Sequence, residues 1–109
     1  MGEALTTQEI EARLKDLPDW ELVPAGPLLV RTFRFADYIA ALAFVNALAA
    51  QGEKANHHAD VIWRFRNVRV ELSTHDVKGV SELDIAMAKS LDELVLPAQN
   101  TDTLTNKDT

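Results

Sequence analysis

The sequence contains no cysteine, which excludes disulfides, thiolate nucleophiles and cysteine-ligated metal sites. Basic residues are few: the chain has 11 Lys and Arg and 17 Asp and Glu, which gives a formal net charge of -6. This balance argues against nucleic-acid and anionic-membrane partners, since both require clustered positive charge. No apolar run approaches the ~20 residues that a membrane-spanning helix needs. The four glycines are scattered along the chain, so a phosphate-binding loop is excluded as well.

The 109 residues and the hydrophobic fraction of 47% suit one domain with one hydrophobic core. We expect this domain to occupy residues 1–96. Residues 97–109 are polar and without periodicity, which predicts a disordered C-terminal tail. Residues 1–4 lack the basic and apolar regions of a signal peptide, so we predict a cytoplasmic protein.

The first half of the chain predicts a helix, a hairpin and a second helix. Thr6 and Glu9 have the spacing of a capping box, and apolar residues then repeat at helical spacing as far as Pro18. Strand-forming residues over 20–23 and 28–35 flank a turn rich in proline, which predicts a hairpin. Asp37 is expected to cap a helix that runs to about Ala50 and ends at residues 51–52.

The second half predicts another hairpin and a third helix. Apolar and polar residues alternate over 61–66 and 68–72, with a turn expected at residues 66–67. Ser81 is expected to cap a helix whose apolar stripe extends back to Asp84, and a carboxylate on such a stripe needs a partner. The order α-β-β-α-β-β-α predicts an α+β fold, with a four-stranded antiparallel sheet and three helices packed on one face.

The three histidines are the candidate functional residues: His57, His58 and His75. They could be structural, lie on a polar surface, bind metal or act in acid/base catalysis. On a regular strand His57 and His58 would point to opposite faces, so a shared site requires a bend there. A metal site completed by Glu53 or Asp84 is disfavoured because the spacing matches no zinc signature. An imidazole pKa of ~6.5 favours acid/base chemistry near neutral pH.

The spacing Glu53-x3-His57-His58, followed by an aromatic residue at Phe65, then His75 and Asp84, resembles the signature of the pterin-4a-carbinolamine dehydratase family. The surrounding sequence is similar over roughly residues 5–95. It includes the segment 72–75 and the glycine and serine at 79 and 81. One departure is Ala59, which stands where the family usually has proline directly after the histidine pair.

The resemblance implies the dehydration of 4a-hydroxytetrahydrobiopterin to quinonoid dihydropterin and water, a step in tetrahydrobiopterin recycling. One imidazole would protonate the leaving 4a-hydroxyl and another would accept the proton of N5. We expect His57 and His75 to be the main proton-transfer pair, with His58 assisting at the 4a-hydroxyl. The pterin is the substrate, and neither a metal nor another cofactor is expected.

Supporting roles are also implied. Glu53 and Asp84 are expected to orient the imidazoles, although a helix-end charge and a helix cap are their simpler interpretations. Ser73 and Thr74 are expected to offer backbone or hydroxyl groups to the flat pterin ring.

The resemblance further implies a homodimer or homotetramer and a functional link to an aromatic amino acid hydroxylase. The alternative function is that of a non-catalytic binding, assembly or transcriptional-cofactor protein on the same fold.

Overall fold

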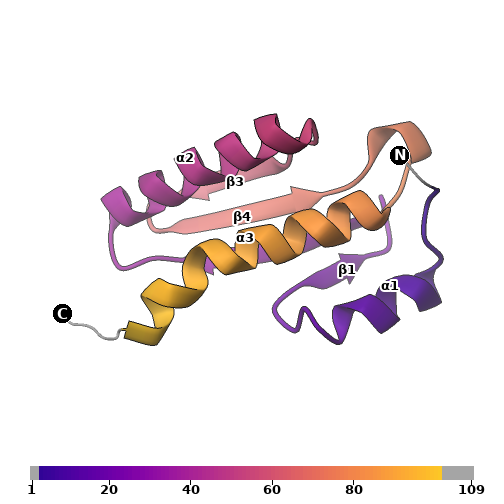
Figure 1. The fold of residues 1–109 in the computed structure, drawn as a ribbon, viewed down its shortest axis with the longest axis horizontal. Coiled ribbons are helices and arrows are strands. Elements are labelled where there is room, and N and C mark those ends of the chain that lie inside the picture. Colours follow the sequence, from indigo (N-terminus) through magenta and orange to yellow (C-terminus); the bar gives the residue numbers. More distant parts are fainter. Residues whose placement is uncertain (1–2, 102–109) are drawn as a thin grey trace.

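The computed structural model describes residues 3–101 and has the predicted α+β fold (Figure 1). Its elements are α1 (Thr7–Leu14), β1 (Glu21–Val23), β2 (Leu28–Arg34), α2 (Tyr38–Ala55), β3 (Asp60–Arg64), β4 (Asn67–Leu72), the short 3-10 helix η1 (His75–Val77) and α3 (Glu82–Thr101). The four strands pair antiparallel in the order β1-β2-β4-β3. The two predicted hairpins therefore join through β2 and β4 at the centre of the sheet.

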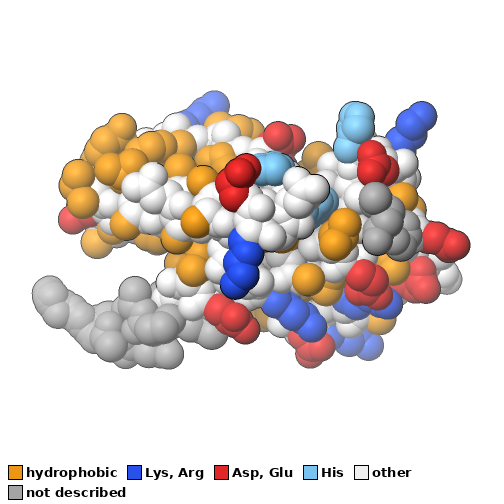
Figure 2. Space-filling model, turned by 45° about the horizontal axis from the view of Figure 1, so that its top comes forward, with side chains coloured by type: hydrophobic (Ala, Val, Ile, Leu, Met, Phe, Trp, Pro, Cys, Tyr) orange, Lys and Arg blue, Asp and Glu red, His pale blue; other side chains and the backbone are white. Residues whose placement is uncertain are grey.

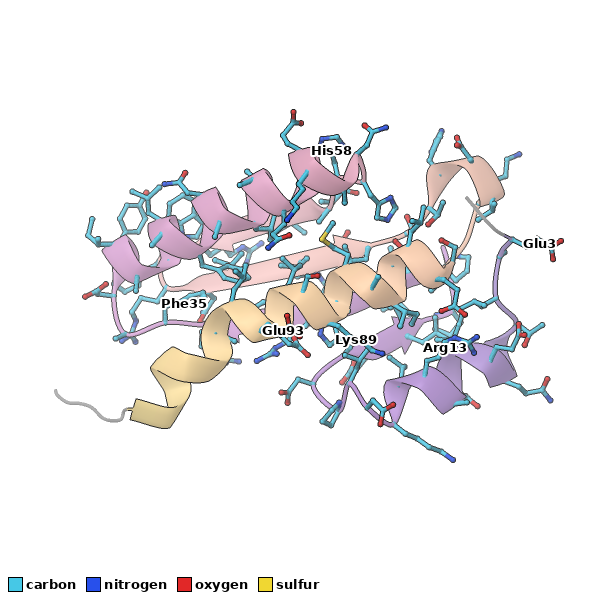
Figure 3. All side chains as sticks on the ribbon, viewed as in Figure 1. Glu3, Arg13, Phe35, His58, Lys89 and Glu93 are labelled. Atoms are coloured by element: carbon cyan, nitrogen blue, oxygen red, sulfur yellow. The ribbon has the colours of Figure 1, made fainter. Side chains whose placement is uncertain are left out.

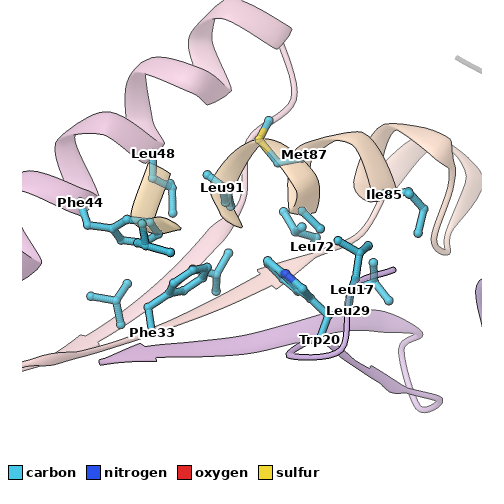
Figure 4. Close-up of a cluster of buried hydrophobic side chains, with 14 of the residues drawn as sticks. Leu17, Trp20, Leu29, Phe33, Phe44, Leu48, Leu72, Ile85, Met87 and Leu91 are labelled. Atoms are coloured by element: carbon cyan, nitrogen blue, oxygen red, sulfur yellow. The ribbon is translucent and has the colours of Figure 1, made fainter. Parts of the chain in front are cut away.

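All three helices contribute to one core on one face of the sheet. Phe44 of α2 and Leu91 of α3 belong to the same cluster of buried side chains (Figure 4). Ile10 of α1 belongs to this cluster as well. Strand β4 has one buried face. Val68, Val70 and Leu72 are fully buried and alternate with polar residues that point to the other face of the sheet. The predicted packing of three helices on one face is thus present.

Local signals at the helix starts act as predicted. The Thr6 side chain accepts a hydrogen bond from the backbone N–H of Glu9, and the Glu9 carboxylate accepts one from the backbone of Thr6. Asp37 caps α2 by accepting from the N–H of Ala40 at 2.8 Å. These side chains satisfy backbone donors that a helix cannot satisfy internally, which fixes where α1 and α2 begin.

Two predicted boundaries were wrong. Helix α2 does not end near Ala50 but continues to Ala55, and Gly52 lies buried inside it. The turn between β3 and β4 lies at residues 65–66 rather than 66–67, because Arg64 already pairs with Asn67. Phe65 takes a φ of 52°, a left-handed conformation that is rare for a bulky side chain.

The C-terminal prediction needs a partial correction. Helix α3 runs through position 97 to Thr101, where a disordered tail was expected from Pro97 onward. Proline lacks the N–H that an internal helical residue donates, yet one such loss does not stop a long helix. The remaining residues of the expected tail, 102–109, lie outside the described residues.

Two sets of charged contacts fasten the helices to the rest of the fold. Arg31 lies on β2 beneath α3, where it donates to Asp92 at 2.6 Å and covers the ring of Phe33 at 4.1 Å. Arg13 of α1 donates to Glu82 in the first turn of α3. That hydrogen bond lowers the pKa of the Glu82 carboxyl and raises the pKa of Arg13. Because this second pair is exposed, it adds little to stability.

No helix among residues 3–101 is both long enough and apolar enough to cross a membrane.

Candidate active site

The candidate site is built around Asp84, whose carboxylate is fully buried in the first turn of α3. One carboxylate oxygen lies 2.6 Å from Nε2 of His57. The other accepts a hydrogen bond from the Thr74 hydroxyl at 2.7 Å and one from the Ser81 backbone N–H at 2.9 Å. Asp84 therefore contacts the backbone at the start of α3 with one oxygen and an imidazole with the other, and its orienting role stays a prediction.

A second hydrogen-bonded pair lies behind this carboxylate. The hydroxyls of Thr74 and Ser81 are 2.6 Å apart, and both residues are buried. The Ser81 hydroxyl also accepts a hydrogen bond from the N–H of Leu83 at 3.2 Å, which makes Ser81 the predicted N-cap of α3. The end of β4 and the start of α3 are thereby joined through side chains.

His57 reaches Asp84 because α2 ends in a tight reversal. Asn56 adopts a left-handed conformation with a φ of 52°, and its N–H donates to the carbonyl of Glu53. The N–H of His57 donates to the carbonyl of Gly52 at 3.0 Å. These two bonds are those of a Schellman motif, in which asparagine replaces the usual glycine. The required bend is thus fixed by the helix end, although Ala59 stands where the family has proline.

Gly52 makes this reversal possible by allowing a close approach. A Cβ atom at this position would lie 3.3 Å from the His57 carbonyl oxygen and 3.4 Å from Cδ2 of His58. The returning chain therefore packs directly on the backbone of α2. The prediction of a glycine at the helix end identified the right residue for the wrong reason, since its role is close packing rather than a left-handed φ.

His58 points away from His57 and toward solvent. Its Nε2 lies 2.6 Å from the Glu53 carboxylate in the last turn of α2, and its side chain is 58% exposed. Figure 3 shows His58 at this end of α2, close to the segment that leads into β3. The predicted orienting role of Glu53 is therefore directed at His58, whereas Asp84 is directed at His57, whose side chain is only 10% exposed.

His75 lies at the other side of the network, as the first residue of η1 and directly after Thr74. Its side chain is exposed, and the three histidines gather in one region of the surface in Figure 2. The turn that carries it is closed by paired backbone bonds between Thr74 and Gly79. Because Thr74 also binds Asp84, the chain next to His75 is fixed to the carboxylate that holds His57.

Ser73 and Thr74 were both expected to contact a ligand, but they differ in exposure. Ser73 is exposed and is free to face the surface. Thr74 is not, because its backbone is paired with Gly79 and its hydroxyl is engaged by Asp84 and Ser81. The Thr74 hydroxyl is therefore a partner of Asp84 and Ser81 rather than a group that faces the surface.

Ser81, Gly52 and Asn56 also build the site, and none of them was among the predicted site residues. The sequence marked Gly52 and Ser81 as helix-boundary residues, and Ser81 was also part of the family resemblance.

The described residues contain no group of three or more His, Asp or Glu side chains that could hold a metal ion. What the site offers is a buried carboxylate, one imidazole fixed by it and two exposed imidazoles. This is a set of groups for moving protons.

The family model for pterin 4 alpha carbinolamine dehydratase matches residues 3–94. The chain belongs to this family. The predicted family and the predicted enzyme class are thus confirmed. A relative from Gloeobacter violaceus that bears the family's name is 44% identical over 89 residues, which cover 80% of this chain and 97% of the relative. Another from Xanthomonas euvesicatoria is 50% identical over 88 residues, covering 77% of this chain and 75% of the relative.

Two solved structures resemble this member of the dehydratase family. A transcriptional coactivator/pterin dehydratase from Brucella melitensis superposes with a TM-score of 0.81 and 34% identity, covering 84% of this chain and 98% of that one. A pterin dehydratase-like protein described as a RuBisCO assembly factor of the alpha-carboxysome has a TM-score of 0.63 and 26% identity, over 72% and 90% of the two chains.

The packing at Gly52 generates a testable prediction. Gly52→Ala should displace the His57–His58 segment by a few tenths of an ångström, because the new Cβ would lie 3.3 Å from the His57 carbonyl oxygen, which is tighter than most such contacts. Unfolding free energy should change by less than about 1 kcal/mol, since alanine is favoured over glycine within a helix by a similar amount. Imidazole NMR resonances of both histidines should shift, while those of His75 stay in place. Unchanged resonances of His57 and His58 would contradict the proposed packing.

Proposed function

We propose that this protein catalyses the dehydration of 4a-hydroxytetrahydrobiopterin to quinonoid dihydropterin and water, by proton transfer through its histidines. The observation that supports this most directly is the contact of His57 with the buried carboxylate of Asp84. A solvent-exposed histidine samples many orientations, whereas this one is held in place by a buried partner, and the other two imidazoles are exposed in the same region of the surface. Membership of the dehydratase family supplies the substrate class.

The reaction requires one acid and one base. The bond between C4a and the hydroxyl oxygen breaks, and the oxygen takes up a proton and leaves as water. The proton on N5 is removed, and its electron pair forms the double bond between N5 and C4a. Atoms and charge balance without any change of oxidation state. Imidazoles suit both tasks because their ordinary pKa of ~6.5 lies near neutral pH.

We assign the main proton transfers to His57 and His75. The two residues follow different elements, α2 and β4, and Asp84 fastens the two segments together through its contacts with His57 and Thr74. His58 is exposed beside Glu53, in a position to assist at the 4a-hydroxyl. Ser73 remains the group that we assign to contact with the pterin ring.

Because the substrate carries a 4a-hydroxyl, this reaction must follow a hydroxylation. An enzyme that forms a 4a-hydroxypterin must supply the substrate, which fits the aromatic amino acid hydroxylases. The quinonoid dihydropterin must then be reduced by a separate two-electron reductant before tetrahydrobiopterin returns to them. The cytoplasmic location expected from the sequence stays a prediction.

We also propose that the chain forms a homo-oligomer through the exposed face of α2. No charged residue occurs between Tyr38 and Gly52, and Ile39 is 68% exposed. Tyr38 stacks on Trp63 at 4.9 Å, and Phe65 adjoins it with 66% exposure. Hydrophobic side chains gather at this end of the molecule in Figure 2. In a chain with a net charge of -6, a neutral apolar face is where a second copy meets the least repulsion.

The second candidate function is a non-catalytic binding or assembly role on the same fold. It is supported by this same apolar face and by the likeness to a protein described as a RuBisCO assembly factor. The enzyme is preferred because all three histidines are present and one is held by a buried carboxylate. A protein that captures a partner in stoichiometric amounts without accelerating the dehydration would reverse this preference.

The dehydratase assay with single histidine variants tests the enzymatic proposal. Purified protein should accelerate the loss of the 4a-carbinolamine absorbance. We expect His57→Ala and His75→Ala each to lower kcat by about 10²- to 10⁴-fold, which is the usual contribution of a general acid or base. His58→Ala provides a matched substitution at an exposed assisting residue and should cost less. Wild-type rates in both the His57 and His75 variants would rule the mechanism out.

The oligomer proposal predicts that Ile39→Glu shifts the protein toward the monomer, because the new carboxylates would face one another across the neutral contact. Sedimentation velocity measures the change. Gln8→Glu introduces the same carboxylate at an exposed position of α1 and should leave the assembly intact. A wild-type protein that sediments as a monomer, or an Ile39→Glu protein that stays fully assembled, would refute the proposed contact.

A further inference from the structure

Beyond Asp84 itself, two buried hydroxyls have no role assigned by the proposed reaction. Thr74 and Ser81 are 3% and 0% exposed, so neither can touch a substrate in this conformation. Both are nevertheless linked by hydrogen bonds to the carboxylate that holds His57. Buried polar groups need partners, and here the partners form an ordered chain rather than separate pairs.

The direction of this chain follows from the number of hydrogens available. The Ser81 oxygen accepts the Leu83 N–H through a lone pair and keeps its own hydrogen, so Ser81 can donate to Thr74 wherever the Thr74 hydrogen is already engaged. Thr74 has a single hydroxyl hydrogen, which it donates to Asp84 at 2.7 Å. Each hydroxyl thus accepts one hydrogen bond and passes one on toward the carboxylate.

Asp84 consequently acts only as an acceptor. One oxygen receives the Thr74 hydroxyl and the Ser81 N–H, and a carboxylate accepts hydrogen bonds at both of its oxygens. The other oxygen lies 2.6 Å from Nε2 of His57 and needs a hydrogen from it. A neutral imidazole carries one ring hydrogen, so placing it on Nε2 leaves Nδ1 with its lone pair.

We infer that Thr74 and Ser81 are positioning residues, whose hydroxyls fix His57 as the Nε2–H tautomer and make Nδ1 its proton-accepting atom. Neither residue touches the reacting atoms. Their effect is exerted through Asp84, as an orienting partner sets the tautomer of a histidine elsewhere. The tautomer of His57 is a property of the ligand-free protein and does not depend on the proposed function. The use of Nδ1 as a base in the dehydration does rest on the proposed function.

The test is ¹⁵N NMR of the histidine rings in ligand-free protein, above the ordinary histidine pKa of ~6.5. Wild-type His57 should show a protonated Nε2 and an unprotonated Nδ1. In Thr74→Val the Asp84 carboxylate loses the hydroxyl that holds its orientation, so its contact with Nε2 loosens and the Nδ1–H form of His57 gains population. Thr74→Ser keeps the hydroxyl and should retain the wild-type tautomer. Thr32→Val makes the same substitution at an exposed position of β2 and should change nothing.

Activity provides a second readout. We expect Thr74→Val to lower kcat by about 10-fold or more with little change in KM, because the residue does not contact the substrate. If Thr74→Val does not fold, Ser81→Ala takes its place, with a smaller shift toward the Nδ1–H form expected. The wild-type tautomer in the folded variant would overturn the inference. A shifted tautomer in a protein without dehydratase activity would support the inference and refute the proposed function instead.

Discussion

The structure around the site depends on the buried carboxylate of Asp84, which needs hydrogen-bond donors on both of its oxygens. An isolated charge in a protein interior costs several kcal/mol or more, unless hydrogen bonds replace the lost water. Its partners come from three separate places: the end of α2, the end of β4 and the start of α3. These elements must meet at one point for the carboxylate to be tolerated, and their meeting places His57 beside the segment that carries His75.

The end of α2 is the second determinant, because it decides where each imidazole points. The left-handed conformation of Asn56 reverses the chain, and Gly52 lets the returning segment lie directly on the helix. Two adjacent histidines then have opposite environments: His57 faces the buried carboxylate and His58 faces solvent beside Glu53. A site can therefore contain one fixed and one adaptable imidazole, although both come from neighbouring positions of the same segment.

Much of this architecture could be predicted from the sequence, since it depends on local or periodic signals. Residue types at the caps predict where helices begin, as at Thr6, Asp37 and Ser81. The alternating pattern predicts the strands, and the apolar stripe predicts α3. Asp84 could be singled out because a carboxylate on a buried stripe needs a partner. That partner could not be identified from spacing alone, because His57 and Asp84 are 27 residues apart and meet only in the fold.

The errors have a common cause. Gly52 was expected to end α2 because glycine often follows a helix, but here its missing Cβ serves the packing of His57 and His58. The helix ends four residues later at Asn56, whose tolerance of positive φ is a weaker signal. Phe65 moves the β3–β4 turn by one residue, against the preference of a bulky side chain. In each case a tertiary contact or the strand register overrides the local preference.

The measurement that tests the central claim most directly is the dehydratase kcat of Asp84→Asn, made alongside its unfolding free energy. An asparagine can keep the hydrogen bonds from Thr74 and Ser81 on its oxygen, but it turns an amide donor toward Nε2 of His57. The structure of the network should survive, while His57 is forced into the opposite tautomer. We predict a folded protein with kcat reduced by about 10²- to 10⁴-fold. A folded Asp84→Asn protein with the wild-type kcat would contradict the claim that this carboxylate organises the site.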